Sequence, residues 1–218
     1  MTQEQTYLLG EQAVVLDLNC ARLDNEQQNR LFALHRHLQK QAGYTDIVVG
    51  KTSLTLVLQD PTQGTKWLEA LLSLWHALSA EDFQPNTHKI PVIYGGEAGP
   101  DLAPLAEQLN LSQQDIVELH SSPTYQVKFL GFLPGFAYLG SVPEQLQVAR
   151  LSSPRTHVPA GSVAIAEDLS AIYPSASPGG WRLLGNSITR LFDANAQSPS
   201  LFQPGDNVKF VPQKEGLC

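Results

Sequence analysis

Residues 129–146 read FLGFLPGFAYLGSVPEQL, and this stretch decides how the second half of the chain is interpreted. Glycine, proline and aromatic residues are mixed too densely for a helix interior, yet the stretch is too apolar for a solvated loop. Glycine allows positive φ or close approach by another group, and proline fixes φ and removes an amide donor. We therefore expect a segment that lies against the protein body and lines a pocket with its rings, which are Phe129, Phe132, Phe136 and Tyr138.

Two later segments have the same character. SPRTHVPAGSVAI, at 153–165, carries Arg155 into a Pro-Gly turn and continues as an apolar strand pattern. IYPSASPGGWRLLGNS, at 172–187, places Tyr173 and Trp181 around a Pro-Gly-Gly turn. Both segments therefore supply further candidates for binding residues.

The overall composition excludes some classes of protein. The chain has 218 residues, of which 42% are hydrophobic and 16% charged, with a formal net charge of -7 and no basic run. Affinity for nucleic acid is largely built from clustered Lys and Arg, so a general phosphate-backbone binder is not expected. An anionic small substrate is compatible with this charge, because one arginine in a pocket is enough to hold a carboxylate.

The cysteines and the N-terminal sequence bear on cellular location. Cys20 and Cys218 are too few for a zinc site and are expected to be free thiols, and no metal site is predicted. MTQEQTYLLGEQ lacks the basic and apolar regions of a signal peptide, and no apolar run reaches the length of a membrane span. The expectation is a cytoplasmic protein with no membrane partner.

The N-terminal part alternates strand and helix patterns. Apolar runs at 7–9 and 13–18 around Gly10 favour a strand or a bent strand. Asp24 resembles an N-cap with Gln27 at the capping-box position, which predicts a first helix. That helix would bury one face, consisting of Leu31, Leu34 and Leu38, while His35 and His37 are interpreted as solvated.

A hairpin and a second helix follow. Runs at 45–49 and 54–58 flank the turn, and Pro61 is expected to open the helix. The helix has an apolar stripe made of Trp67, Leu68, Leu71, Leu72, Trp75 and Leu78. With a further strand at 90–94, the order strand, helix, strand, strand, helix, strand is typical of a ferredoxin-like domain.

A change of pattern marks the expected domain boundary. We predict an α+β protein with a ferredoxin-like domain at 1–84 and a second domain at 85–218. The second domain would start with two short helices, at 101–109 and at 112–120 behind a Ser112 N-cap. Its short strands, separated by proline and glycine, indicate a small barrel or sandwich.

The three pocket segments also carry a family resemblance. The chain resembles the family of the B subunit of the bacterial ATP-dependent 5-oxoprolinase, which includes the kinase-inhibitor protein of sporulating bacteria and the first subunit-like module of allophanate hydrolase. The likeness extends from Tyr7 to the final VPQKEGLC and is densest between Glu118 and Ser187. It implies a cyclophilin-like β-barrel for residues 85–218.

The resemblance also implies an activity. With the larger C subunit the chain would use ATP, with Mg as a candidate companion ion, to phosphorylate and so activate 5-oxo-L-proline, which the A subunit converts to L-glutamate. The chain itself has no GxxxxGK[ST] and no GxGxxG after a strand. We therefore expect it to be inactive alone, with ATP shared with the C subunit. The alternatives are a binding module that inhibits a sensor histidine kinase and an allophanate hydrolase subunit.

Two residues are candidates for catalysis. His120 ends a predicted helix, where spacing alone favours a structural cap and the resemblance favours binding or proton transfer. Arg155, after Pro154, is either a surface residue or a planar fork for a carboxylate. His157 is a weaker candidate, because it faces the same side as Arg155 if the segment is extended.

The candidate substrate-binding residues come from all three segments. They are Phe132, Gly135, Tyr138, Ser162 and Trp181. Without the resemblance, Ser162 would more simply satisfy a turn, and the rings would more often be core than ligand platform. A large ring directly after Pro-Gly-Gly has little regular structure to cover it, so Trp181 is expected at a pocket or a partner surface together with FLGFLPGF.

Overall fold

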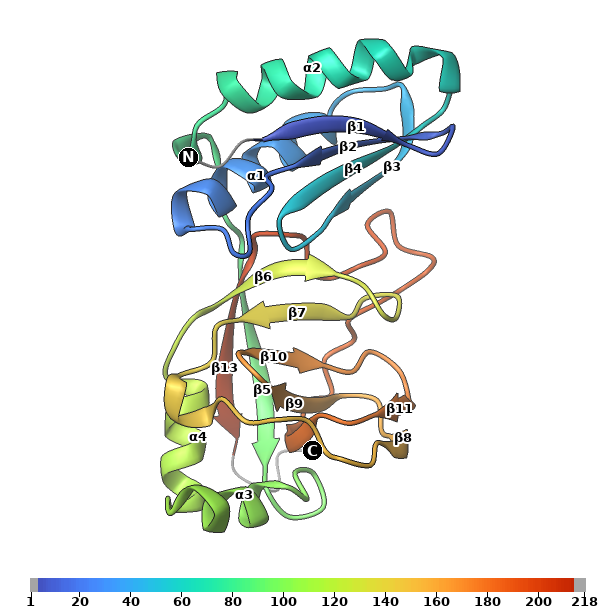
Figure 1. Cartoon of the computed structure of the whole chain (residues 1–218). Coiled ribbons are helices and arrows are strands. Elements are labelled where there is room, and N and C mark those ends of the chain that lie inside the picture. Colours follow the sequence, from blue (N-terminus) through green and yellow to red (C-terminus); the bar gives the residue numbers. More distant parts are fainter. Residues whose placement is uncertain (1–3, 214–218) are drawn as a thin grey trace. The chain divides into compact units, whose positions relative to one another are not determined.

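The computed structural model describes residues 4–213 and separates the chain into two compact units, 1–85 and 86–218. Each unit combines helices with a sheet around a hydrophobic core of its own, which confirms the α+β class (Figure 1). Within residues 4–213, none of the helices combines the length and apolarity that crossing a bilayer requires. Cys20 forms no disulfide, and Cys218 lies outside the described residues.

The first unit is a four-stranded antiparallel sheet with two helices. The strands are β1 (Gln5–Leu9), β2 (Ala13–Asp17), β3 (Tyr44–Val49) and β4 (Ser53–Leu58), in the order β1-β2-β4-β3. The helices are α1 (Asn25–Leu38) and α2 (Gly64–Ala77), with short 3-10 turns η1 (Pro61–Gln63) and η2 (Ala80–Asp82). The run expected as a strand or a bent strand is an antiparallel hairpin of β1 and β2, because Gly10 turns the chain with φ +64°.

Helix α1 begins as its sequence predicts. The Asp24 carboxylate accepts a hydrogen bond from the Gln27 amide at 2.8 Å, and the Gln27 side chain accepts one from the Asp24 amide at 3.2 Å. Leu31, Leu34 and Leu38 are fully buried, as expected. The interpretation of His35 as solvated is wrong, because it lies one turn from Leu31 on the buried side and is 4% exposed.

Helix α2 starts later than predicted. Pro61 opens η1 rather than the helix, and the Asp60 carboxylate caps that turn by accepting from the Thr62 amide at 3.0 Å. The apolar stripe itself is confirmed, since Trp67, Leu71 and Trp75 are buried in the core of the unit. The other stripe residues, Leu68, Leu72 and Leu78, are partly buried against that core.

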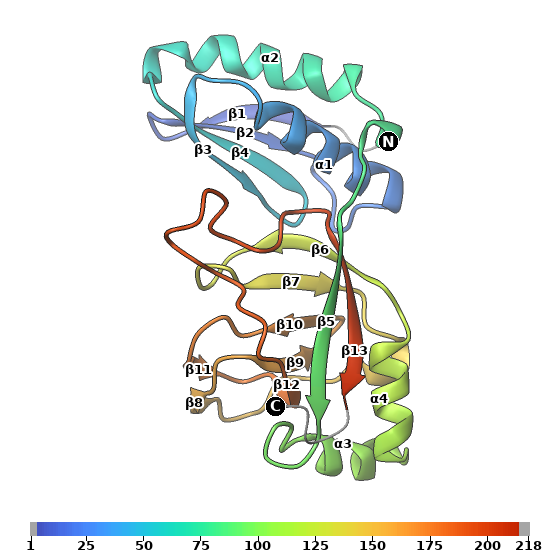
Figure 2. The same cartoon turned by 180° about the vertical axis from the view of Figure 1, so that it is seen from behind.

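The second unit is built on a closed barrel of seven strands. Around the barrel the strands follow the order β10-β7-β6-β13-β5-β12-β9, and a two-stranded sheet, β11-β8, lies beside it (Figure 2). Their bounds are β5 (Thr87–Tyr94), β6 (Tyr125–Leu130), β7 (Ala137–Gly140), β8 (Arg155–Val158), β9 (Ser162–Ala166), β10 (Leu169–Ile172), β11 (Ser177–Gly179), β12 (Arg182–Asn186) and β13 (Asn207–Gln213).

The barrel corrects one part of the predicted topology. The strand expected at 90–94 does not complete the sheet of the first unit but forms β5, which pairs in parallel with β13 and antiparallel with β12. In the first unit β1 pairs with the edge of β2, so the fourth strand of that sheet is β1 and not the strand at 90–94. Hydrophobicity identifies a strand from local sequence, whereas the choice of its pairing partner depends on distant residues.

Strand β9 separates two hydrophobic clusters. Val163 and Ile165 belong to the core inside the barrel, whereas Ala164 and Ala166 belong to a second cluster with Trp181. Alternate residues of a strand point to opposite faces, so this wall of the barrel is covered on both sides, and all five β9 residues are buried. The second cluster lies on the outer face of the barrel wall.

Three further short elements complete the second unit. They are α3 (Leu102–Leu109), α4 (Gln113–Ser121) and the 3-10 turn η3 (Glu144–Leu146). The predicted cap of α4 is confirmed, because the Ser112 hydroxyl accepts from the Asp115 amide at 3.0 Å. Helix α4 packs beside β13, on the side of the barrel away from the β11-β8 sheet (Figures 1 and 2).

Candidate functional site

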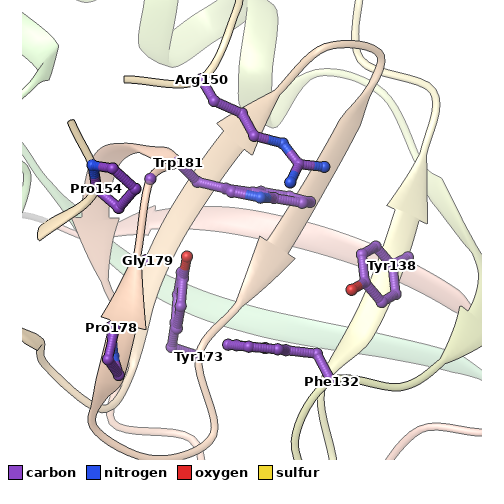
Figure 3. Close-up of a pocket in the computed structure, with 9 residues that line it drawn as sticks. Phe132, Tyr138, Arg150, Pro154, Tyr173, Pro178, Gly179 and Trp181 are labelled. Carbon is purple, nitrogen blue, oxygen red and sulfur yellow. The ribbon is translucent and has the colours of Figure 1, made fainter. Parts of the chain in front are cut away.

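A pocket of about 250 Å³ opens on the outer cluster of the second unit (Figure 3). Its wall combines the three segments that the sequence singled out with one side chain from outside them, Arg150. The lining residues are Phe132, Tyr138, Arg150, Pro154, Tyr173, Pro178, Gly179, Gly180 and Trp181. Each of the three segments therefore contributes to the lining, but Phe129 and Phe136, which were expected to line the pocket, do not. Phe136 is buried in the outer cluster, and Phe129 stacks on Tyr138.

A tight turn presents Phe132 at the rim of the pocket. The Leu133 amide donates to the Gly131 carbonyl at 3.0 Å, which closes a γ-turn, and Phe132 in its centre has φ +72°. Such a φ is unfavourable for a bulky residue, and strained residues of this kind cluster at functional sites. Phe132 as a residue is 60% exposed, although its ring contacts Phe136 and Tyr173 edge to face.

Behind the pocket wall the buried ring of Phe136 interlocks with the lining rings. The Trp181 ring packs 6.0 Å from both Phe136 and Tyr138, and Phe136 packs 5.4 Å from Tyr173. At its other end, the Tyr173 hydroxyl lies directly beside Gly179 of β11. A side chain at Gly179 would collide with that hydroxyl, so glycine is needed there. Rigid rings at fixed angles suit a small planar ligand.

One cation supplies the electrostatics of the pocket. The Arg150 guanidinium lies 5.9 Å from the centre of the Trp181 ring (Figure 3). Burial raises the pKa of Tyr138 and Tyr173, while the nearby charge of Arg150 acts in the opposite direction. Arg150 is not among the residues that the sequence predicts for the site. Its local sequence gave little indication of this position, because Arg150 stands in VARLSS, just before the second segment, with no turn residue beside it.

Arg155 has a protein carboxylate as its partner. One terminal nitrogen, Nη2, lies 2.6 Å from Oδ1 of Asp101, and the other donates to the Trp181 carbonyl at 3.5 Å. The second Asp101 oxygen accepts from the Leu183 amide at 2.6 Å. Arg155 thus shares its two terminal nitrogens between a protein carboxylate and a backbone carbonyl, and does not make the two parallel bonds to one carboxylate that were predicted. It does not line the pocket, and its catalytic role stays a prediction.

His120 lies on the opposite side of the barrel wall from this pocket. Its Nδ1 is 2.8 Å from the Tyr94 hydroxyl and its Nε2 is 2.9 Å from Ser170 Oγ, while the ring stacks on Phe210 at 4.7 Å. Phe210 belongs to the core inside the barrel. The structure therefore does not bring His120 together with Trp181, and its catalytic role stays a prediction.

The remaining predicted residues divide between the pocket and its support. Phe132, Tyr138 and Trp181 line the pocket, whereas Gly135 and Ser162 do not. A side chain at Gly135 would meet Phe192 Cβ at 2.8 Å, so this glycine allows close packing behind the Phe132 turn. Ser162 is 2% exposed in β9. His157 is exposed and does not line the pocket.

Trp181 differs from its expected exposure. The sequence favours a ring presented to a partner, but only 6% of the residue is accessible, because Phe136, Tyr138 and β9 cover it. The short β11-β8 sheet supplies the regular structure that the Pro-Gly-Gly sequence did not indicate. Among the predicted pocket rings, Phe132 is the exposed one.

Two buried histidines predict how stability depends on pH. Burial lowers the pKa of His35 to about 4, with Arg36 adding to the effect and Asp46 opposing it, and burial lowers that of His120 to about 3. The unfolded chain then binds more protons below pH 6.5, so the folded state loses stability as the pH falls. Each histidine should lower the free energy of unfolding of its unit by about 2 kcal/mol as the pH falls from 6.5 to 5.

Urea unfolding of the full chain across this range of pH measures the effect. His157→Gln is the matched control, because this exposed histidine should leave the profile unchanged. A free energy of unfolding that stays constant from pH 6.5 to 5 contradicts the buried, neutral state of both rings.

Comparison with known proteins gives the chain a family. Residues 5–202 match the model of the carboxyltransferase domain, subdomain C and D. The chain is 43% identical to the B subunit of 5-oxoprolinase from Escherichia coli O157:H7 over the full length of both proteins. It is 41% identical to the B subunit of 5-oxoprolinase from Haemophilus influenzae, with 93% of this chain and 95% of that protein covered.

Among solved structures, the crystal structure of TTHA0988 resembles this fold. It superimposes with a TM-score of 0.79 and 34% identity over 94% of this chain. The match covers 40% of TTHA0988, so this chain spans about two fifths of that protein's length. The identity to the curated relatives along their whole length is what assigns the family. The chain belongs to the family of the 5-oxoprolinase B subunit, whose fold is the carboxyltransferase domain, subdomain C and D.

Proposed function

We propose that the chain acts as the B subunit of an ATP-dependent 5-oxoprolinase and contributes the aromatic pocket to the site that binds 5-oxo-L-proline. The observation that carries this proposal is the 43% identity to a protein named as the B subunit of 5-oxoprolinase over the entire length of both chains. The pocket supports it, since it joins flat apolar walls to one cation, as a small cyclic carboxylate requires.

The partners are proposed on the same ground. The larger C subunit completes the activating site, and the A subunit converts the activated intermediate to L-glutamate. The exposed ring of Phe132 at the rim gives such a partner an apolar contact beside the ligand. In fold terms, we propose that the first unit is ferredoxin-like, with β1 in the position of the last strand, and that the barrel is cyclophilin-like.

The ATP requirement belongs to the assembled enzyme in this proposal. A pocket of about 250 Å³ with one cationic side chain does not fit a nucleoside triphosphate, whose phosphates need several donors. Among residues 4–213, no group of three His, Cys, Asp or Glu side chains is placed to hold a metal ion. We therefore assign no step with ATP to the residues of this pocket.

The proposal predicts that the isolated chain neither hydrolyses ATP nor opens 5-oxo-L-proline. Co-purified with the C subunit and assayed with the A subunit, it should show ATP hydrolysis that depends on 5-oxo-L-proline and release of glutamate. Omitting each subunit in turn is the control. Turnover by the isolated chain would contradict the prediction that it needs the other subunits. An inactive three-subunit mixture would contradict the proposed function.

A further inference from the structure

The cation above Trp181 has a weak and exposed counter-ion. Nε of Arg150 lies 3.6 Å from Oε1 of Glu167, and the two side chains are 57% and 64% exposed. Such exposed surface pairs contribute little to stability and are easily exchanged. Glu167 is also held in place by its backbone, since its amide donates to the Val148 carbonyl at 2.6 Å. Because the Arg150–Glu167 pair is weak, a ligand carboxylate can replace the Glu167 side chain at low cost.

The second unit offers a direct comparison in Arg155. That arginine binds the largely buried Asp101 at 2.6 Å and also reaches a backbone carbonyl, so its donors are already used by the protein. Among the nine residues that line the pocket, Arg150 carries the only side-chain charge. Its guanidinium lies above the Trp181 ring, with Tyr173 and Phe132 on the other side of that ring in the view of Figure 3. An anion in this pocket would meet Arg150 first.

We propose that Arg150 is the specificity residue of this pocket: its guanidinium exchanges Glu167 for the carboxylate of a small ring compound that lies against Trp181. A planar fork suits a carboxylate because it donates two parallel hydrogen bonds, and its position over an aromatic face keeps it oriented. Glu167 then competes with the ligand carboxylate for the Arg150 guanidinium, so anions that bind weakly do not displace it. The inference rests on the proposed function in taking 5-oxo-L-proline as the ligand.

The test compares an acid with its uncharged analogue. Dissociation constants for 5-oxo-L-proline and 5-oxo-L-prolinamide are measured on the assembled enzyme, together with kcat/KM for the acid. Arg150→Met should weaken binding of the acid about tenfold or more and change binding of the amide less than about threefold. Arg150→Lys should weaken binding of the acid less than Arg150→Met does, because lysine keeps the charge and loses the planar fork.

Two further variants sharpen the test. Glu167→Gln should tighten binding of the acid and leave the amide unaffected. Arg190→Met is the matched control, because Arg190 forms a comparable surface pair with Asp193 and does not line the pocket. Loss of acid and amide binding by the same factor in Arg150→Met would mean a structural role through Trp181 and overturns the inference.

Failure of the proposed function is separable from failure of this inference. If the wild-type assembly does not turn over 5-oxo-L-proline, a series of small cyclic carboxylates is titrated into the isolated chain, with the Arg150 side-chain resonances followed by NMR. Binding that needs the carboxylate and is lost in Arg150→Met supports the role of Arg150 for another acid. If no carboxylate shifts those resonances, the inference is wrong.

Discussion

Replacing Trp181 by alanine is expected to lower the free energy of unfolding by about 3–5 kcal/mol, because the ring is almost completely buried between Phe136, Tyr138 and β9. The sequence alone favoured the opposite result, namely weaker association with a partner at little cost to the isolated chain. Trp181 is already buried in the isolated chain, so the substitution should lower folding stability before it affects association with a partner. Urea unfolding of the isolated chain gives the value.

Phe132→Ala is the matched control for this substitution. It removes an aromatic ring from the same pocket, but one that is 60% exposed, so the free energy of unfolding should change by less than about 1 kcal/mol. The same variant should weaken association with the C subunit if the rim contacts that protein. Equal stability losses in the two variants would contradict the assignment of Trp181 to the core and Phe132 to the rim.

Asp101→Ala is expected to cost about 3–5 kcal/mol of stability, since it leaves the partly buried Arg155 and the Leu183 amide without their shared acceptor. The carboxylate links the start of α3 to β8 and β12, so its loss loosens the support under Trp181. The double variant Asp101→Ala with Arg155→Met should recover part of the loss, because it removes both charges.

An exposed pair provides the comparison for Asp101. Asp193→Ala breaks the pair with Arg190, whose side chain is 71% exposed, and should cost no more than about 1 kcal/mol. Both variants are measured by urea unfolding under the same conditions. A loss at Asp101 no greater than at Asp193 would show that the Asp101–Arg155 pair does not hold the outer cluster together.

The sequence by itself determined features that depend on neighbouring residues. The caps at Asp24 and Ser112, the apolar stripe of α2 and the strand at Val163 and Ile165 follow from side chains a few residues apart, so they could be predicted correctly. The three segments rich in Gly, Pro and aromatic residues likewise identified the pocket, because such a composition suits neither a helix nor a solvated loop.

Tertiary structure decided everything that depends on which distant segments meet. The pairing of β5 with β13, the partner of Arg155 and the position of His120 on the inner side of the β9 wall all join residues far apart in sequence. Arg150 shows this most clearly, since its local sequence resembles that of any surface arginine. It becomes a candidate for ligand binding only because folding places it over the aromatic face of Trp181 at the edge of a pocket.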